Sequence, residues 1–268
     1  MAIYKEIKVK NILNKTTLPG VDFTINPYIG CEHACAYCYA RFIYKIFDID
    51  PARWGEHVFV KINAIDVLKK ELRKAKGKRI FIGSATDPYQ PAERIYKLTR
   101  GILEVLSNIR CDVSILTKSS LILRDLDVIK KMNAEIGVSL TSLDNIVYKE
   151  FEPRTAPPME RIRILENAKK KGIRTYVFIA PFLPIFTEQD FEEIIVLLKR
   201  IGISEIYVDK LNLKAKNWIT ISAAIRRIDS SIFKEFWMRA KDENYWERLK
   251  KEIMRLSEYY GIDIVVLF

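Results

Sequence analysis

Three cysteines near the start of the chain stand close enough together to bind one metal centre. Cys31, Cys35 and Cys38 have C-x3-C-x2-C spacing in "GCEHACAYCYAR" (30–41), with a tyrosine on either side of the third. Thiolates are soft ligands that favour zinc and iron–sulfur clusters, and oxidised cysteines can instead pair as disulfides. The spacing of the cysteines, their possible partner ligands and the redox state of the compartment distinguish between these possibilities.

The surroundings of the cysteines argue against a disulfide. The sequence shows no signal-peptide pattern and no apolar run of membrane-spanning length. We therefore expect a cytoplasmic protein with no membrane partner, in which thiols stay reduced. Four cysteines in 268 residues are also too few for a disulfide scaffold.

Zinc also fits less well than an iron–sulfur cluster. A structural zinc takes four ligands, usually from two separated pairs, and the second pair is missing here. His33 could be a fourth ligand, but four ligands would then crowd into eight residues. Cys111 opens a predicted strand, and we expect it to be buried away from the loop. Three thiolates suit a [4Fe-4S] cluster with one open iron.

The charge balance admits a phosphate-bearing partner. Lys and Arg number 45 against 34 Asp and Glu, so the formal net charge is +11. A positive field attracts DNA or RNA, although a Lys- and Glu-rich solvated surface of the thermophilic kind gives the same balance.

Short β-branched runs alternate with longer amphipathic stretches and predict parallel βαβ units. Six units fit a partial or full α/β barrel, or an open doubly wound sheet. The predicted strands are 21–28, 79–85, 112–118, 135–141, 175–181 and 205–211, and the predicted helices lie near 61–75, 94–108, 121–133, 158–171 and 188–201.

The alternation ends after residue 212. Three helical patterns follow, and we expect the last to end at Gly261 as a left-handed cap, before the final apolar run "IDIVVLF". We predict a barrel over 1–213 and, over 214–268, a mainly helical extension with a final short strand that packs on the barrel.

A barrel of this kind assigns its basic residues to two sides, because the loops after the strands form the active face. The basic runs 69–79 and 169–174 enter strands, so we expect them to be solvated surface away from that face. The candidates for phosphate contact on the active rim follow strands: Arg94, Lys97, Arg100, Lys210, Lys214 and Lys216.

The cysteine motif, with Tyr37 as the aromatic residue before the third cysteine, resembles that of the radical S-adenosylmethionine (SAM) superfamily. "SATDPYQPAE", "ILTKSSLILRD", "VSLTSLD" and "EPRTAPPMERI" follow in order, each at a strand end, and together resemble the branch of spore photoproduct lyase and the DNA-repair-photolyase-like proteins. The resemblance covers residues 5–212 and implies a partial (β/α)6 TIM-like barrel.

The resemblance also implies the cofactors and their ligands. Cys31, Cys35 and Cys38 would bind a [4Fe-4S] cluster, whose open iron would take the amino and carboxylate groups of SAM. An external one-electron reductant would then cleave SAM to a 5′-deoxyadenosyl radical, which abstracts hydrogen from a substrate. The positions that match SAM contacts of the branch are Tyr37, Ser84, Thr86, Asp87, Lys118 and Ser139. An Asp-Pro turn cap at Asp87 and a solvent-reaching Lys118 are the alternatives.

The branch resemblance favours a nucleic-acid base as substrate, for repair or modification. Spore photoproduct lyase has a hydrogen-donor cysteine where this chain has Ala85, and its radical-relay tyrosines match Tyr37 and Tyr39, so Tyr39 is our candidate catalytic residue. Candidate substrate contacts are Arg154, Asp209, Lys210 and Asn212, with an ion pair between Arg154 and Glu152 as the alternative use of that arginine. Radical modification of a peptide or small metabolite, and a non-enzymatic metal-stabilised nucleic-acid-binding protein, are the alternative functions.

Overall fold

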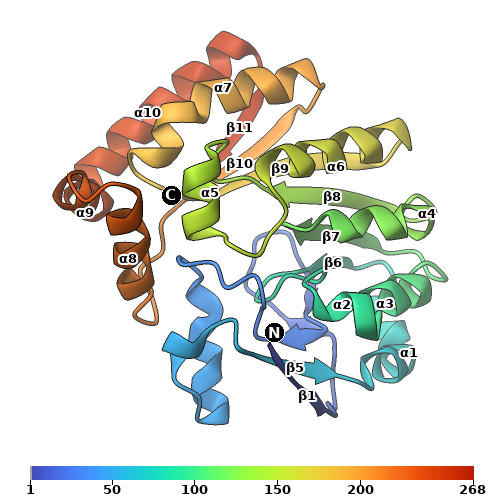
Figure 1. Cartoon of the computed structure of the whole chain (residues 1–268). Coiled ribbons are helices and arrows are strands. Elements are labelled where there is room, and N and C mark those ends of the chain that lie inside the picture. The colour runs from blue at the N-terminus through green and yellow to red at the C-terminus, as the bar shows by residue number, and fades with distance from the viewer. Residues whose placement is uncertain (1) are drawn as a thin grey trace.

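A computed structural model describes residues 2–268, and its framework is an eight-stranded sheet in the order β11-β10-β9-β8-β7-β6-β3-β2 (Figure 1). Six parallel strands form the predicted partial barrel. They are β3 (Phe23–Ile25), β6 (Arg79–Ile82), β7 (Asp112–Thr117), β8 (Asn133–Ser139), β9 (Arg174–Phe182) and β10 (Glu205–Lys210). The predicted (β/α)6 barrel is confirmed.

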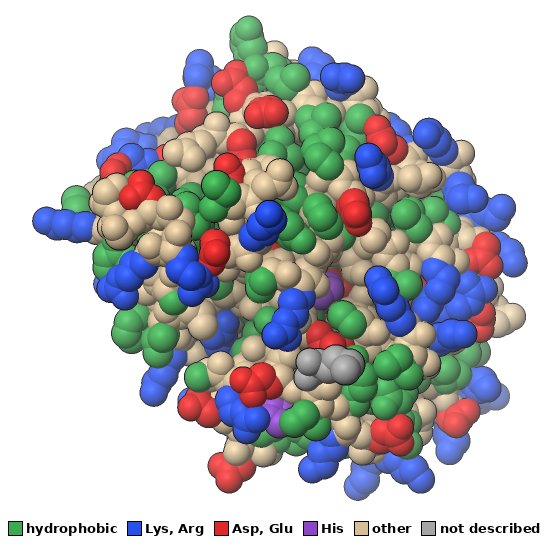
Figure 2. All heavy atoms as spheres, viewed as in Figure 1, with side chains coloured by type: hydrophobic (Ala, Val, Ile, Leu, Met, Phe, Trp, Pro, Cys, Tyr) green, Lys and Arg blue, Asp and Glu red, His purple; other side chains and the backbone are tan. Residues whose placement is uncertain are grey.

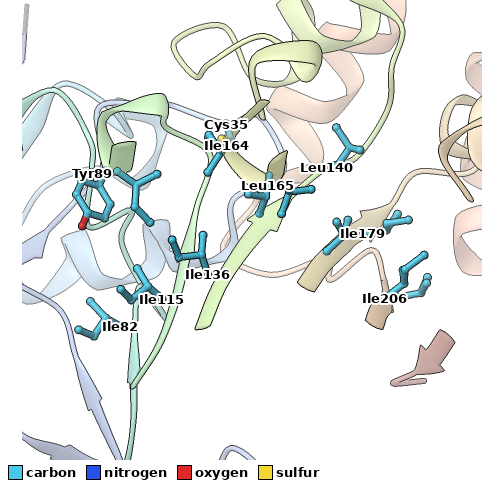
Figure 3. Packing of buried hydrophobic residues seen from close by; sticks show 14 of the residues in the cluster. Cys35, Ile82, Tyr89, Ile115, Ile136, Leu140, Ile164, Leu165, Ile179 and Ile206 are labelled. Atoms are coloured by element: carbon cyan, nitrogen blue, oxygen red, sulfur yellow. The ribbon is translucent and has the colours of Figure 1, made fainter. Parts of the chain in front are cut away.

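The barrel core is a row of branched apolar side chains in register across the strands. Ile82 pairs with Ile115 and Ile115 with Ile136, and none of the three is exposed to solvent. Figure 3 shows these residues in sequence across the sheet, followed by Ile179 and Ile206. Branched side chains fill a pleated surface well, and their burial stabilises the sheet. The strand ends that carry polar residues are thereby fixed relative to one another.

Helices follow the strands as the barrel requires, but the helix at Asn145–Phe151 was not predicted and two predicted helices are divided. The helices are α1 (Ala64–Ala75), α2 (Ala92–Tyr96), α3 (Leu98–Leu106), α4 (Leu126–Ile129), α5 (Asn145–Phe151), α6 (Pro158–Lys170) and α7 (Phe186–Arg200). The single helix predicted near 94–108 is divided, because Lys97 adopts a left-handed conformation with φ of 50°. The helix predicted at 121–133 is a 3₁₀ helix in its first part, η3 (Ser120–Asp125), and continues as the short α4.

A second, three-stranded sheet at the N-terminal side was not predicted. It contains β1 (Ile3–Ile7), β5 (His57–Lys61) and β4 (Tyr28–Ile29), while β2 (Asn14–Lys15) adds an antiparallel edge to the main sheet. The predicted strand 21–28 is therefore two strands in two sheets, β3 and β4. The cysteine loop follows directly after this change of sheet.

The C-terminal part of the chain joins the main sheet. α8 (Trp218–Ile228), α9 (Phe233–Lys241) and α10 (Glu243–Tyr260) precede β11 (Asp263–Val266), which pairs parallel with β10. Gly261 ends α10 in the left-handed conformation predicted for it, with φ of 59°. α10 packs against α7, and α8 against α5 (Figure 1). The division into a barrel over 1–213 and an extension over 214–268 stays a prediction. None of the helices in residues 2–268 is long and apolar enough to cross a membrane.

Candidate active site

The cysteine loop begins at Gly30, directly after β4. Gly30 has φ of +84°, and a Cβ there would lie 2.3 Å from the carbonyl oxygen of His57, so this position requires glycine. Cys31 and Cys35 are 7% exposed and Cys38 is half-buried, and all are free thiols. Cys111 is buried just before β7 with its thiol toward the Leu106 carbonyl, away from the loop as predicted.

The three thiols are close enough to influence one another. Burial and the neighbouring Cys31 raise the pKa of Cys38 to about 11. Burial also raises the pKa of Cys35, and the neighbouring Cys38 and Cys31 raise it as well. Within residues 2–268, however, no three Cys, His, Asp or Glu side chains converge tightly enough to hold a single metal ion.

The donor set distinguishes a zinc site from a cluster. A structural zinc takes four ligands, whereas three thiolates can hold a cluster with one open iron. His33, the candidate fourth zinc ligand, lies beside Asp87 with 3.3 Å between Nδ1 and Oδ2. Burial would lower the pKa of His33, but Asp87 and Cys31 raise it to about 10. The donor set therefore fits an iron–sulfur cluster.

The backbone of the cysteine loop is held by a buried arginine. Arg41, only 2% exposed, donates from Nη2 to the carbonyls of Cys35 (3.2 Å) and Ala36 (2.9 Å) and from Nε to that of Cys38 (3.0 Å). The amide of Ala36 in turn donates to the carbonyl of Phe151, at the end of α5, over 2.8 Å. These contacts fix the chain between the second and third cysteines.

Tyr37 joins the loop to a buried ion pair. Its hydroxyl donates to Glu152, whose other carboxylate oxygen pairs with Arg161. Glu152 is 3% exposed and Arg161 is 0% exposed. Burial would raise the pKa of Glu152, but Arg161 and Lys118 hold it below its usual range. The Glu152 partner is therefore Arg161, and the alternative pair with Arg154 is not formed.

Lys118 and Asp87 meet at the ends of neighbouring strands. The Lys118 Nζ lies 5.8 Å from the centre of the Tyr37 ring, so this side chain faces the cysteine loop. Asp87 accepts hydrogen bonds from the Lys118 amide and the Thr117 hydroxyl, both over 2.7 Å, and from the Tyr89 amide over 2.9 Å. Burial would raise the pKa of Asp87, but His33 above all lowers it to about 2. Asp87 thus caps its own turn and also orients the Lys118 backbone.

The remaining predicted SAM residues line the same strand ends. The buried Thr86 hydroxyl donates to the Gly30 carbonyl (2.7 Å), and the Ser84 hydroxyl accepts from Asn26 (2.9 Å). Ser139 is buried at the end of β8, with its carbonyl accepting from Arg161 (3.0 Å). Their assignment to SAM stays a prediction.

Tyr39 lies on the open side of the cysteine loop. Its side chain is 43% exposed, and its hydroxyl donates to the Ser84 carbonyl over 2.8 Å. Burial, Cys38 and Asp209 raise its pKa. Ala85, at the position of the branch's cysteine, packs against the cluster of buried side chains that contains Cys31. Tyr39 and Ala85 therefore both border the thiols.

Three of the four predicted substrate residues line one depression of about 380 Å³. Asp209, Lys210 and Asn212 form it together with Leu211, Leu213, Leu267 and Phe268. Burial raises the pKa of Asp209. Arg154 does not join this group: it is exposed, and its Nη1 donates to the Gly55 carbonyl over 3.2 Å.

Within residues 2–268, some of the predicted rim cations form ion pairs and others do not. Arg100 is paired with Glu104 (2.9 Å), Asp125 and Asp127 (both 3.0 Å), so its predicted availability for phosphate is wrong. Lys210 pairs with Glu243 at 3.0 Å. The exposed rim cations without an ion-pair partner in residues 2–268 are Arg94, Lys97, Lys214 and Lys216. Figure 2 shows Lys and Arg spread over the viewed face of the molecule, with acidic side chains among them.

The comparisons with known proteins concern the family and the fold. Residues 25–198 match the family model of the radical SAM superfamily. The chain belongs to the radical SAM superfamily. Membership implies SAM, an iron–sulfur cluster and an external reductant. An uncharacterized protein of Methanocaldococcus jannaschii is 40% identical over 211 residues, 78% of each chain. Another, of Mycobacterium bovis, is 30% identical over 277 residues, 97% of this radical SAM protein and 81% of the relative.

The fold has a close counterpart among solved structures. A spore photoproduct lyase variant with dinucleoside spore photoproduct superposes with a TM-score of 0.75 at 15% identity, covering 99% of this chain and 81% of that one. At this identity the likeness concerns the fold alone. The predicted superfamily is confirmed, and the likeness to spore photoproduct lyase holds for the fold.

Several residues of the site were not predicted. Arg41, Gln90, Asn217 and Thr220 all bond to the cysteine loop or to Thr86 beside it. Arg161 stood within a quoted motif, yet its role was not recognised. A fully buried arginine needs a carboxylate partner, but the sequence does not show which arginine will be buried.

Proposed function

We propose that Cys31, Cys35 and Cys38 bind one [4Fe-4S] cluster and that the protein uses it with SAM to abstract hydrogen from a nucleic-acid base. The single observation that supports this most is the group of three neighbouring free thiols at the carboxyl ends of the barrel strands. The loaded cluster would supply reductive cleavage of SAM to a 5′-deoxyadenosyl radical.

The side chains around the thiols would bind and orient SAM. The Lys118 ammonium, near the Tyr37 ring, supplies a cation for a carboxylate, and Ser139 and Thr86 supply hydroxyls at neighbouring strand ends. The barrel core beneath them excludes water from one side. All of these residues belong to the face formed by the carboxyl ends of the strands, where enzymes with a barrel fold carry out their chemistry.

Tyr39 is our candidate for hydrogen return to the substrate. The hydroxyl of Tyr37 is committed to Glu152, whereas Tyr39 is 43% exposed beside the thiols. Ala85 cannot donate hydrogen as a thiol does. We therefore propose a reaction that differs from thiol-assisted spore photoproduct repair.

A nucleic-acid substrate is supported by charge and by the motif resemblance. The net charge is +11, and Arg94, Lys97, Lys214 and Lys216 stand open on the exposed surface. The related fold was solved with a dinucleoside photoproduct bound to that protein. A base must leave a duplex to reach the barrel mouth, so single-stranded or damaged sites would bind best.

Anaerobic reconstitution tests the cofactor part of the proposal. Iron and sulfide near one cluster per chain are expected, and the Cys31, Cys35 and Cys38 triple alanine variant should bind none. Reduction with SAM should yield 5′-deoxyadenosine. Stoichiometric zinc without iron would overturn the radical chemistry and favour the metal-stabilised nucleic-acid-binding alternative.

Deuterium transfer tests the substrate. Deuterated cellular RNA, DNA, peptide and small-molecule fractions are each incubated with the reduced protein and SAM, and deuterium is measured in 5′-deoxyadenosine. Transfer from DNA or RNA supports the proposal. Transfer from the peptide or metabolite fraction alone would replace the nucleic-acid base by the alternative substrate while leaving the radical chemistry in place.

A further inference from the structure

Helix α8 begins against the cysteine loop, although about 180 residues of chain separate them. The side-chain amide of Asn217, at the N-terminus of α8, donates to the Tyr37 carbonyl over 2.9 Å and to the Asn212 carbonyl over 2.8 Å. Thr220, in the first turn of α8, donates its hydroxyl to the Ala36 carbonyl over 2.5 Å. Ala36 and Tyr37 lie between the second and third cysteines.

The orientation of the Asn217 amide is fixed by its neighbours. Both carbonyls accept only, so the NH₂ group must face them. Asn217 is 0% exposed, and its Oδ1 has no hydrogen-bond partner in residues 2–268. A buried acceptor without a partner is costly. The chain tolerates this unpaired acceptor at a position where the two hydrogen bonds donated by Asn217 join Tyr37 to Asn212.

The Ala36 and Tyr37 carbonyls differ in the other hydrogen bonds that they accept. The Ala36 carbonyl also accepts from Arg41 over 2.9 Å, so it keeps a partner without Thr220. Asn217 is the one described side chain that donates to the Tyr37 carbonyl among residues 2–268. Asn217 therefore has the larger influence on the loop.

We infer that Asn217 and Thr220 are positioning residues, through which the C-terminal part of the chain sets the conformation of the cysteine loop. Because Asn217 also holds Asn212, it ties the wall of the depression at 209–213 to the chain between the second and third cysteines. This inference concerns the chain's own residues; only its consequence for a bound cluster rests on the proposed function.

The test compares Asn217→Asp and Thr220→Val with a control on the same helix. The aspartate has the same shape but cannot donate, so two carbonyls would face a carboxylate. Arg227→Ala removes the Arg227–Glu150 ion pair between α8 and α5 and leaves the cysteine loop untouched. All variants are studied well below their melting temperatures, so that each is folded.

The first measurement is the alkylation rate of Cys35 and Cys38 in the apo protein, followed by mass spectrometry. Loss of one buried hydrogen bond of average strength corresponds to about a fivefold change in a local opening equilibrium. We expect about tenfold faster alkylation in Asn217→Asp, since repulsion adds to the loss, about two- to fivefold in Thr220→Val, and no change in Arg227→Ala. Equal rates in Asn217→Asp and Arg227→Ala would overturn the inference.

The second measurement uses the reconstituted protein. Asn217→Asp should release iron to a chelator faster and shift the midpoint potential of the cluster, while Arg227→Ala should do neither. A lowered melting temperature with unchanged potential and unchanged alkylation would show a merely structural role and overturn the inference. If the wild-type protein takes up no iron, the proposed function fails, and the alkylation rates alone still decide the role of Asn217.

Discussion

Replacing Glu152 by alanine should destabilise the apo protein by about 3 kcal/mol. Removing one partner of a buried ion pair costs about 3–5 kcal/mol, because the other charge stays buried and unpaired. Arg161 would keep its bonds to the Ala156 carbonyl (2.7 Å), the Ser139 carbonyl (3.0 Å) and the Thr155 hydroxyl (2.6 Å). These contacts satisfy its donors but not its charge, so we expect the lower end of the range.

Urea unfolding of the metal-free protein measures this free energy, and a thermal scan should show a decrease in the melting temperature of about 6–12 °C. Glu56→Ala is the matched control, since Glu56 also pairs with an arginine (Arg53, 2.8 Å) but is 54% exposed. An exposed pair contributes at most about 1 kcal/mol. If Glu152→Ala costs no more than Glu56→Ala, the reasoning about the buried pair is refuted.

Two further measurements locate the effect of Glu152. In a double-mutant cycle, Tyr37→Phe and Glu152→Ala should be non-additive by about 1 kcal/mol, because either change removes the same hydrogen bond. The pKa of Glu152 is lower in the folded state, so its contribution to stability is present above its unfolded pKa of about 4.3. That contribution is lost as the pH falls through the folded value, and Glu152→Gln should lack this loss. A wild-type acid profile in the Gln variant would contradict the assignment.

Three other predictions concern the cofactor face and the rim. Lys118→Ala and Ser139→Ala should each weaken SAM binding about tenfold by calorimetry without loss of iron; normal binding in both would show that the SAM assignment is wrong. Lys214→Glu should reduce the salt dependence of single-stranded DNA binding by about one counterion. Lys76 is equally exposed but lies at the opposite end of the strands, so Lys76→Glu should leave the salt dependence unchanged. Equal effects of the two substitutions would argue against a nucleic-acid rim. The Asp87 carboxylate, with a pKa of about 2, should contribute stability above pH about 4 that is lost as the pH falls toward 2; Asp87→Asn should lack that loss in acid unfolding.

The strands of the barrel were predictable because their signal is local. Runs such as "RIFIGSA" combine branched apolar residues with a polar end, and the residues that follow predict the return helix. The second sheet gave no such signal. β1, β4 and β5 come from three separate segments, and β4 has only two residues, so their pairing follows from tertiary contacts.

The electrostatic partners on the rim were also not predictable. Arg100 and Lys210 are sequence candidates equal to Arg94 and Lys214, since each follows a strand. In the folded chain Arg100 meets Asp125 and Asp127, and Lys210 meets Glu243. These carboxylates lie on other elements of the fold. The sequence positions of the lysines and arginines do not show which carboxylates they will meet.

The sequence by itself determined the superfamily and the barrel, and it predicted the metal ligands. Cysteine spacing within eight residues is a local property, and ligand chemistry follows from residue type and spacing. Tertiary structure alone decided which arginine neutralises Glu152 and which distant residues hold the Ala36 and Tyr37 carbonyls. Hydrogen bonds and ion pairs act over about 3 Å, and only folding brings Arg161, Asn217 and Thr220 within that distance of their partners.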